Sequence, residues 1–184
     1  KKLGLLQPIG ATMDKWSPDH QHMPVLDGEE SGTLFTIPGS GEDEGARIQS
    51  AIGQRDVMLS PLQAANLVVT LLNDGEVKRP RILQEIRYQT GSVMKSFQVQ
   101  TWLERGEGVS AKTAAMIRSW MRDVVTEGTG KSLNALQWNV AGKSGTAQIG
   151  ETSKENQWFI GYGPVDHPKY AVAVMVEKTD RLSG

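Results

Sequence analysis

The sequence contains no cysteine in its 184 residues, so neither a disulfide framework nor a thiol nucleophile is available to it. Histidine is almost as scarce, with three in total. His20 and His22 would share one face of a strand, and His167 stands in a predicted turn between two strands. No second cluster completes a zinc-binding set. We therefore predict no metal site and no cofactor.

Strong net charge and long apolar runs are also missing. The formal net charge is −1, which gives no reason to expect a nucleic-acid partner. No run of about 18 apolar residues occurs, so the sequence predicts no membrane span within these residues. The hydrophobic content of 38% and the charged content of 22% are ordinary for a globular chain. The length suffices for one hydrophobic core.

Composition divides the chain into three segments. Residues 1–47 are rich in glycine, proline and acidic residues and are predicted to form loops. Their paired carboxylates, as in Asp27-Gly28-Glu29-Glu30, are interpreted as solvated loop charge rather than as an acid–base or metal site. Residues 48–130 are predicted to form a helical segment with a β-hairpin. Residues 131–184 are predicted to supply the strands of a sheet.

Two helices are predicted in the middle segment. Ser60 can cap the first, Gln63 completes a capping box, and Gly75 ends the helix. Ser110 can cap the second, and Gly128 ends it. The apolar residues at helical spacing are predicted to pack in the core: Leu62, Ala65, Val69 and Leu72 in the first helix, and Ala114, Met116, Ile117, Trp120, Met121 and Val124 in the second.

Alternating patterns predict the strands. Residues 82–100 form a predicted hairpin around the turn Gln89-Thr90-Gly91-Ser92. Three antiparallel strands are predicted further on, one entered through Leu136, Trp138 and Val140, then 157–162 and 170–176. The last strand has apolar residues on both faces, which predicts that helices cover both sides of the sheet.

The stretch Gly142-Lys143-Ser144-Gly145-Thr146 places a cation, two hydroxyls and a glycine on one predicted strand. In a strand, Lys143 and Gly145 point to one face while Ser144 and Thr146 point to the other. This combination suits the binding of a carboxylate, and a peptide-like ligand could lie along the strand edge. The alternative interpretation of Lys143 is a surface lysine that protects an edge strand against aggregation.

Gly-Lys-Ser also occurs in phosphate-binding loops, and the chain has it at Gly130-Lys131-Ser132 and at Gly142-Lys143-Ser144. Such a loop needs a glycine five positions earlier and must run into a helix. Val125 and Gln137 occupy those earlier positions, and Lys143 lies in a strand pattern. Nucleotide binding is therefore not predicted.

Further motifs flank the Lys143 strand. They are Ile52-Gly53-Gln54, Leu59–Ala65, Asn73-Asp74-Gly75, Gly128-Thr129-Gly130, Thr146-Ala147-Gln148, Trp158–Tyr162 and Tyr170–Glu177. In this order they resemble the transpeptidase domain of class B (monofunctional) penicillin-binding proteins, from about Ile48 to Glu177. Lys-[Ser/Thr]-Gly is one of three signatures that β-lactamases and penicillin-binding proteins share. The Thr-Ala-Gln ending favours class B over the bifunctional class A enzymes.

The resemblance implies an α/β (α+β) fold, an antiparallel sheet with helices on both faces, of which residues 1–184 are the C-terminal portion. It implies a peptidoglycan D,D-transpeptidase, in which a serine attacks the D-Ala-D-Ala bond and β-lactams mimic that dipeptide. In this family pattern Lys143 supplies positive charge, Ser144 and Thr146 donate to the substrate carboxylate, and Gly145 permits close approach. Gln148 borders the substrate, and the N–H of Thr146 forms half of the oxyanion hole.

The nucleophile is expected outside this chain. In the family, Ser-x-x-Lys and the middle Ser-x-Asn motif both precede the Ile-Gly-Gln segment, and nothing upstream of Ile48 supplies either. Ser92-Val93-Met94-Lys95 and Ser132-Leu133-Asn134 fit the short patterns but are interpreted as decoys. A nucleophilic serine of this kind needs the first turn of a buried helix, whereas Ser92 belongs to the predicted hairpin. The start at Lys1 and the end at Gly184 fit a fragment.

The resemblance also implies partners and a location. The expected ligands are peptidoglycan stem peptides and β-lactam antibiotics, and the expected partners are the N-terminal half of the same domain and division or elongation proteins. An extracytoplasmic position is implied, with an N-terminal membrane anchor outside this chain. The alternative hypothesis is a non-catalytic module that senses β-lactams or muropeptides, or acts as a scaffold. Sensor domains lack the long insertion seen here between Ala65 and Gly128, which favours the enzyme.

Overall fold

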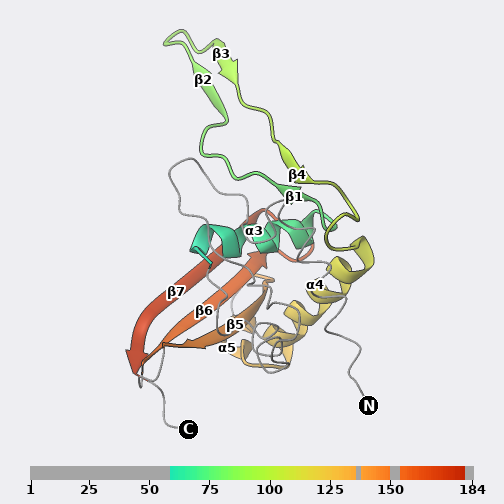
Figure 1. The fold of residues 1–184 in the computed structure, drawn as a ribbon, viewed down its shortest axis with the longest axis vertical. Helices are drawn as coiled ribbons and strands as arrows, with labels where there is room; N and C mark the ends of the chain where they lie inside the picture. The colour runs from blue at the N-terminus through green and yellow to red at the C-terminus, as the bar shows by residue number, and fades with distance from the viewer. Residues whose placement is uncertain (1–58, 136–137, 150–153, 181–184) are drawn as a thin grey trace, which may run out of the picture.

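The computed structural model describes residues 59–135, 138–149 and 154–180, which form helices and antiparallel strands (Figure 1). In chain order they are α3 (Pro61–Leu72), β1 (Val77–Lys78), β2 (Glu85–Arg87), β3 (Val93–Ser96), β4 (Thr101–Leu103), α4 (Ala111–Thr126), α5 (Lys131–Asn134), β5 (Ala141–Gln148), β6 (Lys154–Gly163) and β7 (Tyr170–Asp180).

Among the described residues, the main sheet has three antiparallel strands in the order β5-β6-β7, and β5 lies at its edge. Lys143 is opposite Ile160, which is opposite Ala173. The predicted succession of three antiparallel strands is confirmed. The entry into the first strand differs, because the strand begins at Ala141, and Trp138 precedes it as an exposed residue.

Helix α3 begins and ends where local sequence signals place it. The Ser60 hydroxyl accepts from the Gln63 amide at 3.2 Å, and the Gln63 side chain accepts from the Ser60 amide at 2.8 Å. This reciprocal pair satisfies two amides that the first turn leaves unpaired. Gly75 follows with φ of 91°, and a Cβ there would stand 1.8 Å from the Val109 carbonyl oxygen. The predicted cap and end of the helix are therefore confirmed.

The buried face of α3 differs from the predicted one. Val68 is fully buried and Ala64 nearly so, while the predicted core residues Leu62, Ala65, Val69 and Leu72 are half-buried. The other buried positions of α3 are occupied by the polar residues Gln63, Asn66 and Thr70, which form hydrogen bonds. Asn66 donates to the Lys78 carbonyl oxygen at 3.0 Å, and Thr70 donates to the Asn66 carbonyl oxygen at 2.9 Å. A buried polar side chain with a partner avoids the desolvation penalty of an unpaired one.

Helix α4 is capped by Ser110, whose hydroxyl accepts from the Thr113 amide at 3.1 Å, as predicted. Its buried line consists of Ala114, Met121 and Val125. Trp120 is 56% exposed, so its predicted place in the core is wrong. At 3.6 residues per turn it lies about 120° around the helix from the buried line, which turns it toward solvent.

One other core prediction for α4 fails in the same way. Met116 is 43% exposed on the outer face of α4. Ile117 and Val124 of the same predicted stripe are half-buried at its margin. The helical period was therefore right, but the centre of the apolar face lies nearer Val125 than Trp120.

The core lies between both long helices and one face of the sheet. Val68 of α3 and Met121 of α4 pack with Ala141 and Tyr162 of the sheet. Figure 1 shows α3 crossing the strands and α4 beside β5. The predicted mixture of helices with an antiparallel sheet is confirmed.

The opposite face of the sheet carries apolar side chains that the described residues leave exposed. Val172, Val174 and Val176 of β7 are about half exposed. The short α5 borders this face, where Leu133 and Phe159 line a cavity of about 410 Å³. A full helical cover on this second side remains a prediction.

The predicted hairpin is confirmed and is longer than expected. Strand β2 pairs with β3, and β1 pairs with β4 nearer the body of the molecule. Figure 1 shows this ribbon projecting away from the sheet. Its tip residues are exposed, as expected for a two-stranded ribbon that packs on neither side.

Candidate active site

Strand β5 borders a cavity that it shares with α3. The volume is about 290 Å³, and the lining includes Lys143, Gly145 and Ile160 from the sheet and Ala64 and Leu67 from the helix. The Lys143 ammonium group donates to the carbonyl oxygen of Ser144. The side chain is exposed, so its positive charge is accessible from the edge of the sheet.

Ser144 points to the other face of the strand, where it meets a residue from a distant turn. Its hydroxyl lies 2.9 Å from the hydroxyl of Thr129, and either oxygen can be the donor. Lys143 and Ser144 therefore flank the edge of β5 from opposite sides, as the strand period predicted. Sequence reasoning assigned no role to Thr129, although its Gly-Thr-Gly motif was noticed.

Glycine at position 145 is not required by the packing of the fold. A Cβ built there would lie 3.7 Å from the Cβ of Trp158, which is an ordinary contact. Gly142 differs, because a Cβ there would stand 2.3 Å from Cζ of Phe159 and 2.8 Å from the Ile160 carbonyl oxygen. The fold thus explains Gly142 and leaves Gly145 to be explained by what approaches the strand.

The two remaining predicted site residues lie further along β5. Thr146 is exposed and stands opposite Gln157, on the same face as Ser144. Gln148 is exposed and ends the strand opposite Glu155. The predicted set 143–148 therefore forms one continuous stretch of an edge strand.

The decoy motifs lie elsewhere and lack the geometry of a nucleophile. The Ser92 hydroxyl lies 3.0 Å from the Thr90 hydroxyl in the hairpin turn. Lys95 lies in β3 with its ammonium group 4.8 Å from the centre of the Phe97 ring. Ser132 belongs to the four-residue helix α5. Neither serine occupies the first turn of a buried helix.

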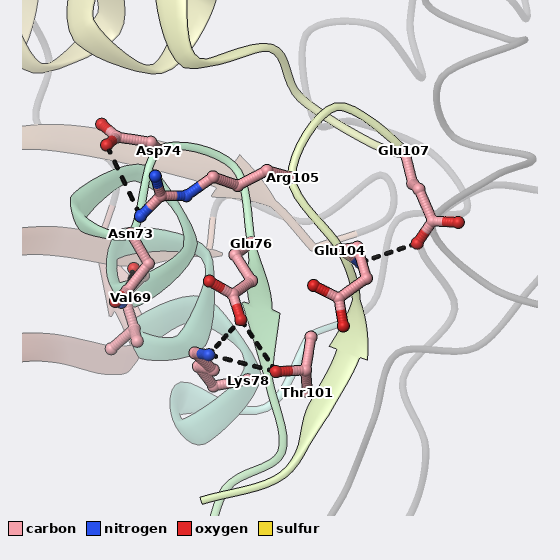
Figure 2. Close-up of polar contacts among 9 residues, drawn as sticks. All are labelled: Val69, Asn73, Asp74, Glu76, Lys78, Thr101, Glu104, Arg105 and Glu107. Carbon is pink, nitrogen blue, oxygen red and sulfur yellow. Dashed lines mark hydrogen bonds and ion pairs between the residues drawn. The ribbon is translucent and has the colours of Figure 1, made fainter.

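A separate polar cluster closes the base of the hairpin (Figure 2). The Glu76 carboxylate accepts hydrogen bonds from the Lys78 ammonium group and from the Thr101 hydroxyl, the latter at 2.8 Å. The hydrogen bond from Lys78, followed by that from Thr101, lowers the pKa of Glu76. These contacts join β1 to β4, so the cluster belongs to the hairpin rather than to the candidate site.

The pKa of Tyr162 is also shifted. Burial raises the pKa of its phenol, and the positive charges of Arg118 and Arg122 act in the opposite direction. Its hydroxyl donates to the Arg118 carbonyl oxygen at 3.5 Å, which points it toward α4. Tyr162 therefore contributes to packing between sheet and helix.

No helix among the described residues is long and apolar enough to cross a membrane.

The fold and the edge strand define a class of protein. Residues 14–184 match the family model of the penicillin binding protein transpeptidase domain, and the chain belongs to that family. The predicted class B resemblance is confirmed by the relatives.

Two curated relatives show the similarity at the level of sequence. The chain is 35% identical over 147 residues to the peptidoglycan D,D-transpeptidase PbpA of Mycolicibacterium smegmatis, covering 77% of this chain and 29% of the relative. It is 33% identical over 157 residues to the stage V sporulation protein D of Bacillus subtilis, covering 83% of this chain and 24% of the relative. The chain thus spans less than a third of the length of these relatives.

Solved structures show the similarity of the fold. The crystal structure of PBPA from Mycobacterium tuberculosis matches with a TM-score of 0.73 at 27% identity, covering 95% of this chain and 38% of that one. The imipenem acyl-enzyme complex of penicillin-binding protein A from M. tuberculosis matches with the same TM-score and identity, covering 94% of this chain and 38% of that one.

Proposed function

We propose that the chain is the C-terminal portion of a peptidoglycan D,D-transpeptidase domain, in which β5 binds the carboxylate end of the substrate. The observation that carries the proposal is the pair Lys143 and Ser144, which flank an edge strand beside a cavity of about 290 Å³. Relatives at 35% and 32% identity are named peptidoglycan D,D-transpeptidases. A related solved structure is an acyl-enzyme complex with imipenem, which supports covalent chemistry.

The reaction proceeds in two acyl-transfer steps. A serine outside this chain attacks the carbonyl carbon of the D-Ala-D-Ala bond, forms an ester and releases the terminal D-Ala. The amine of a neighbouring stem peptide then attacks the ester, forms the cross-link and returns the proton to the serine. A β-lactam opens its ring on the same serine and leaves a stable ester.

The residues of β5 bind and orient the substrate. Lys143 supplies a fixed positive charge for the terminal carboxylate, and Ser144 and Thr146 donate hydrogen bonds to it. Gly145 permits close approach of the ligand backbone, which adds to the strand edge. The Thr146 amide contributes half of the oxyanion hole, and Gln148 borders the bound peptide.

The location and partners follow from this activity. The stem peptides lie outside the cytoplasmic membrane, so the domain works on the extracytoplasmic side, anchored by a segment that precedes these residues. The N-terminal half of the domain supplies the nucleophile and packs against this chain. Stem peptides and β-lactams are the ligands, and division or elongation proteins are the candidate partners.

Labelling by a fluorescent penicillin tests the proposal in the complete protein that carries this chain. Lys143→Ala is expected to slow labelling by roughly 10- to 100-fold, because one charge-assisted hydrogen bond is lost. Lys112→Ala is the matched control, since Lys112 is an exposed lysine on α4. Equal labelling of the wild type and Lys143→Ala would contradict the role of β5.

A further inference from the structure

The hydroxyl of Thr129 is the one side-chain group outside β5 that the described contacts bring to Ser144. The two oxygens lie 2.9 Å apart, although the residues are separated by 15 positions in the sequence. Both side chains belong to the surface of the molecule, Thr129 being exposed and Ser144 half-buried. A hydrogen bond at an accessible surface has no desolvation penalty that would force it to form.

The turn that carries Thr129 is held tightly. The amides of Gly128 and Gly130 both donate to the Val124 carbonyl oxygen, at 3.1 and 2.9 Å. A Cβ on Gly128 would stand 3.0 Å from that oxygen, and one on Gly130 would stand 3.2 Å from it. Thr129 thus lies between two glycines whose amides both bind the Val124 carbonyl oxygen near the end of α4. The backbone position of Thr129 is therefore fixed by these hydrogen bonds.

The number of hydrogens on the two hydroxyls limits what the contact between Thr129 and Ser144 can do. Each hydroxyl carries one hydrogen. The hydrogen of one hydroxyl forms the bond between the pair, and the hydrogen of the other remains available to a third group. When Thr129 donates to Ser144, the hydrogen of Ser144 is left to point along the edge of β5. Ser144 then both accepts and donates, and such chains of hydrogen bonds strengthen one another.

We propose that Thr129 is a positioning residue that orients the Ser144 hydroxyl toward the carboxylate bound on β5. The proposal rests on the proposed transpeptidase function and extends it from the strand to the Gly-Thr-Gly turn. Helix α4, through the turn at its end, thereby contributes to substrate binding without touching the substrate. A hydroxyl is required at position 129, whereas its methyl group is not.

The experiment compares Thr129→Val with Thr129→Ser in the complete protein, using a fluorescent penicillin. The second-order rate constant of labelling is expected to fall about tenfold in Thr129→Val, the weight of one hydrogen bond, and to return to within about twofold of the wild type in Thr129→Ser. The loss is expected in the binding of the penicillin more than in the rate of the acylation step. Thermal unfolding of each variant is measured beside it, and Thr129→Ala replaces Thr129→Val if the valine variant does not fold.

A double-mutant cycle separates positioning from a general structural effect. In a Ser144→Ala background, Thr129→Val is expected to change labelling by less than about twofold, because Thr129 then has no hydroxyl to orient. A full additional loss in that background would overturn the proposal. Labelling of Thr129→Val at the wild-type rate would also overturn the proposal, but it would leave the proposed function intact. Absence of labelling in the wild type would instead overturn the proposed function, and this inference with it.

Discussion

Arg122 donates a hydrogen bond of 2.6 Å from its Nη1 atom to the carbonyl oxygen of Val140, immediately before β5 begins. The same guanidinium group donates from Nη2 to Oδ1 of Asn134 at 3.3 Å. One arginine of α4 thus fixes the entry into the strand that carries Lys143. The planar guanidinium makes the two contacts with two separate nitrogen atoms held in a fixed geometry, whereas a lysine has a single nitrogen.

The first prediction concerns this arginine. Arg122→Met is expected to lower the free energy of unfolding by about 2 kcal/mol, because a charge-assisted hydrogen bond to a partly buried carbonyl is lost. Penicillin labelling of the complete protein is expected to slow as well, since the start of β5 is no longer held. Urea unfolding and labelling are compared with Lys112→Met, an exposed position on the same helix. Equal stability of the two variants would show that Arg122 does not hold β5.

The second prediction separates a glycine that the fold needs from one that the ligand needs. Gly142→Ala is expected to destabilise the protein by about 1–3 kcal/mol, because the added Cβ would overlap the ring of Phe159. Gly145→Ala has room beside Trp158 and is expected to leave the free energy of unfolding within about 0.5 kcal/mol of the wild type. The same Gly145→Ala variant is expected to lose penicillin labelling.

The pair is informative because the two substitutions are chemically identical and lie on one strand. Urea unfolding reports stability, and the rate of labelling reports ligand approach. Normal labelling of a stable Gly145→Ala variant would show that the ligand does not pass close to this residue. A stable Gly142→Ala variant would show that the Phe159 ring moves aside at little cost.

Local signals in the sequence were sufficient to predict the caps of the two long helices and the order of the strands. Helix caps and strand alternation depend on residues within a few positions of one another, so the caps at Ser60 and Ser110 and the order of strands were predicted correctly. The position of Lys143 and Ser144 on opposite faces followed from the same local period. These features need no knowledge of which segment packs on which.

Features that depend on distant contacts were not predictable in the same way. Asn66 is buried because its amide reaches the carbonyl of Lys78, which belongs to the strand after the helix. Trp120 is exposed because Val125 rather than Trp120 lies at the centre of the packed face. Thr129 reaches Ser144 only because α4 and β5 lie side by side. No pattern along the chain marks such pairs before the fold is known.

The third prediction concerns the acid sensitivity of the hairpin base. The pKa of Glu76 is lowered by hydrogen bonds from Lys78 and Thr101, so the folded protein holds the charged form more tightly than the unfolded chain does. The stabilisation is therefore complete above the ordinary pKa of a glutamate. It is lost as the pH falls through the lowered pKa, because protonation then removes the negative charge that strengthens both hydrogen bonds.

Comparison of the wild type with Glu76→Gln measures this effect. The glutamine keeps the shape of the side chain but has no charge to titrate. The urea midpoint of the wild type is expected to exceed that of Glu76→Gln at pH 7, and the gap is expected to narrow as the pH falls from about 5 to about 3. High salt should reduce the gap at pH 7, since Glu76 and Lys78 are near the surface. A gap that stays constant down to pH 3 would mean that the charge of Glu76 does not stabilise the join between β1 and β4.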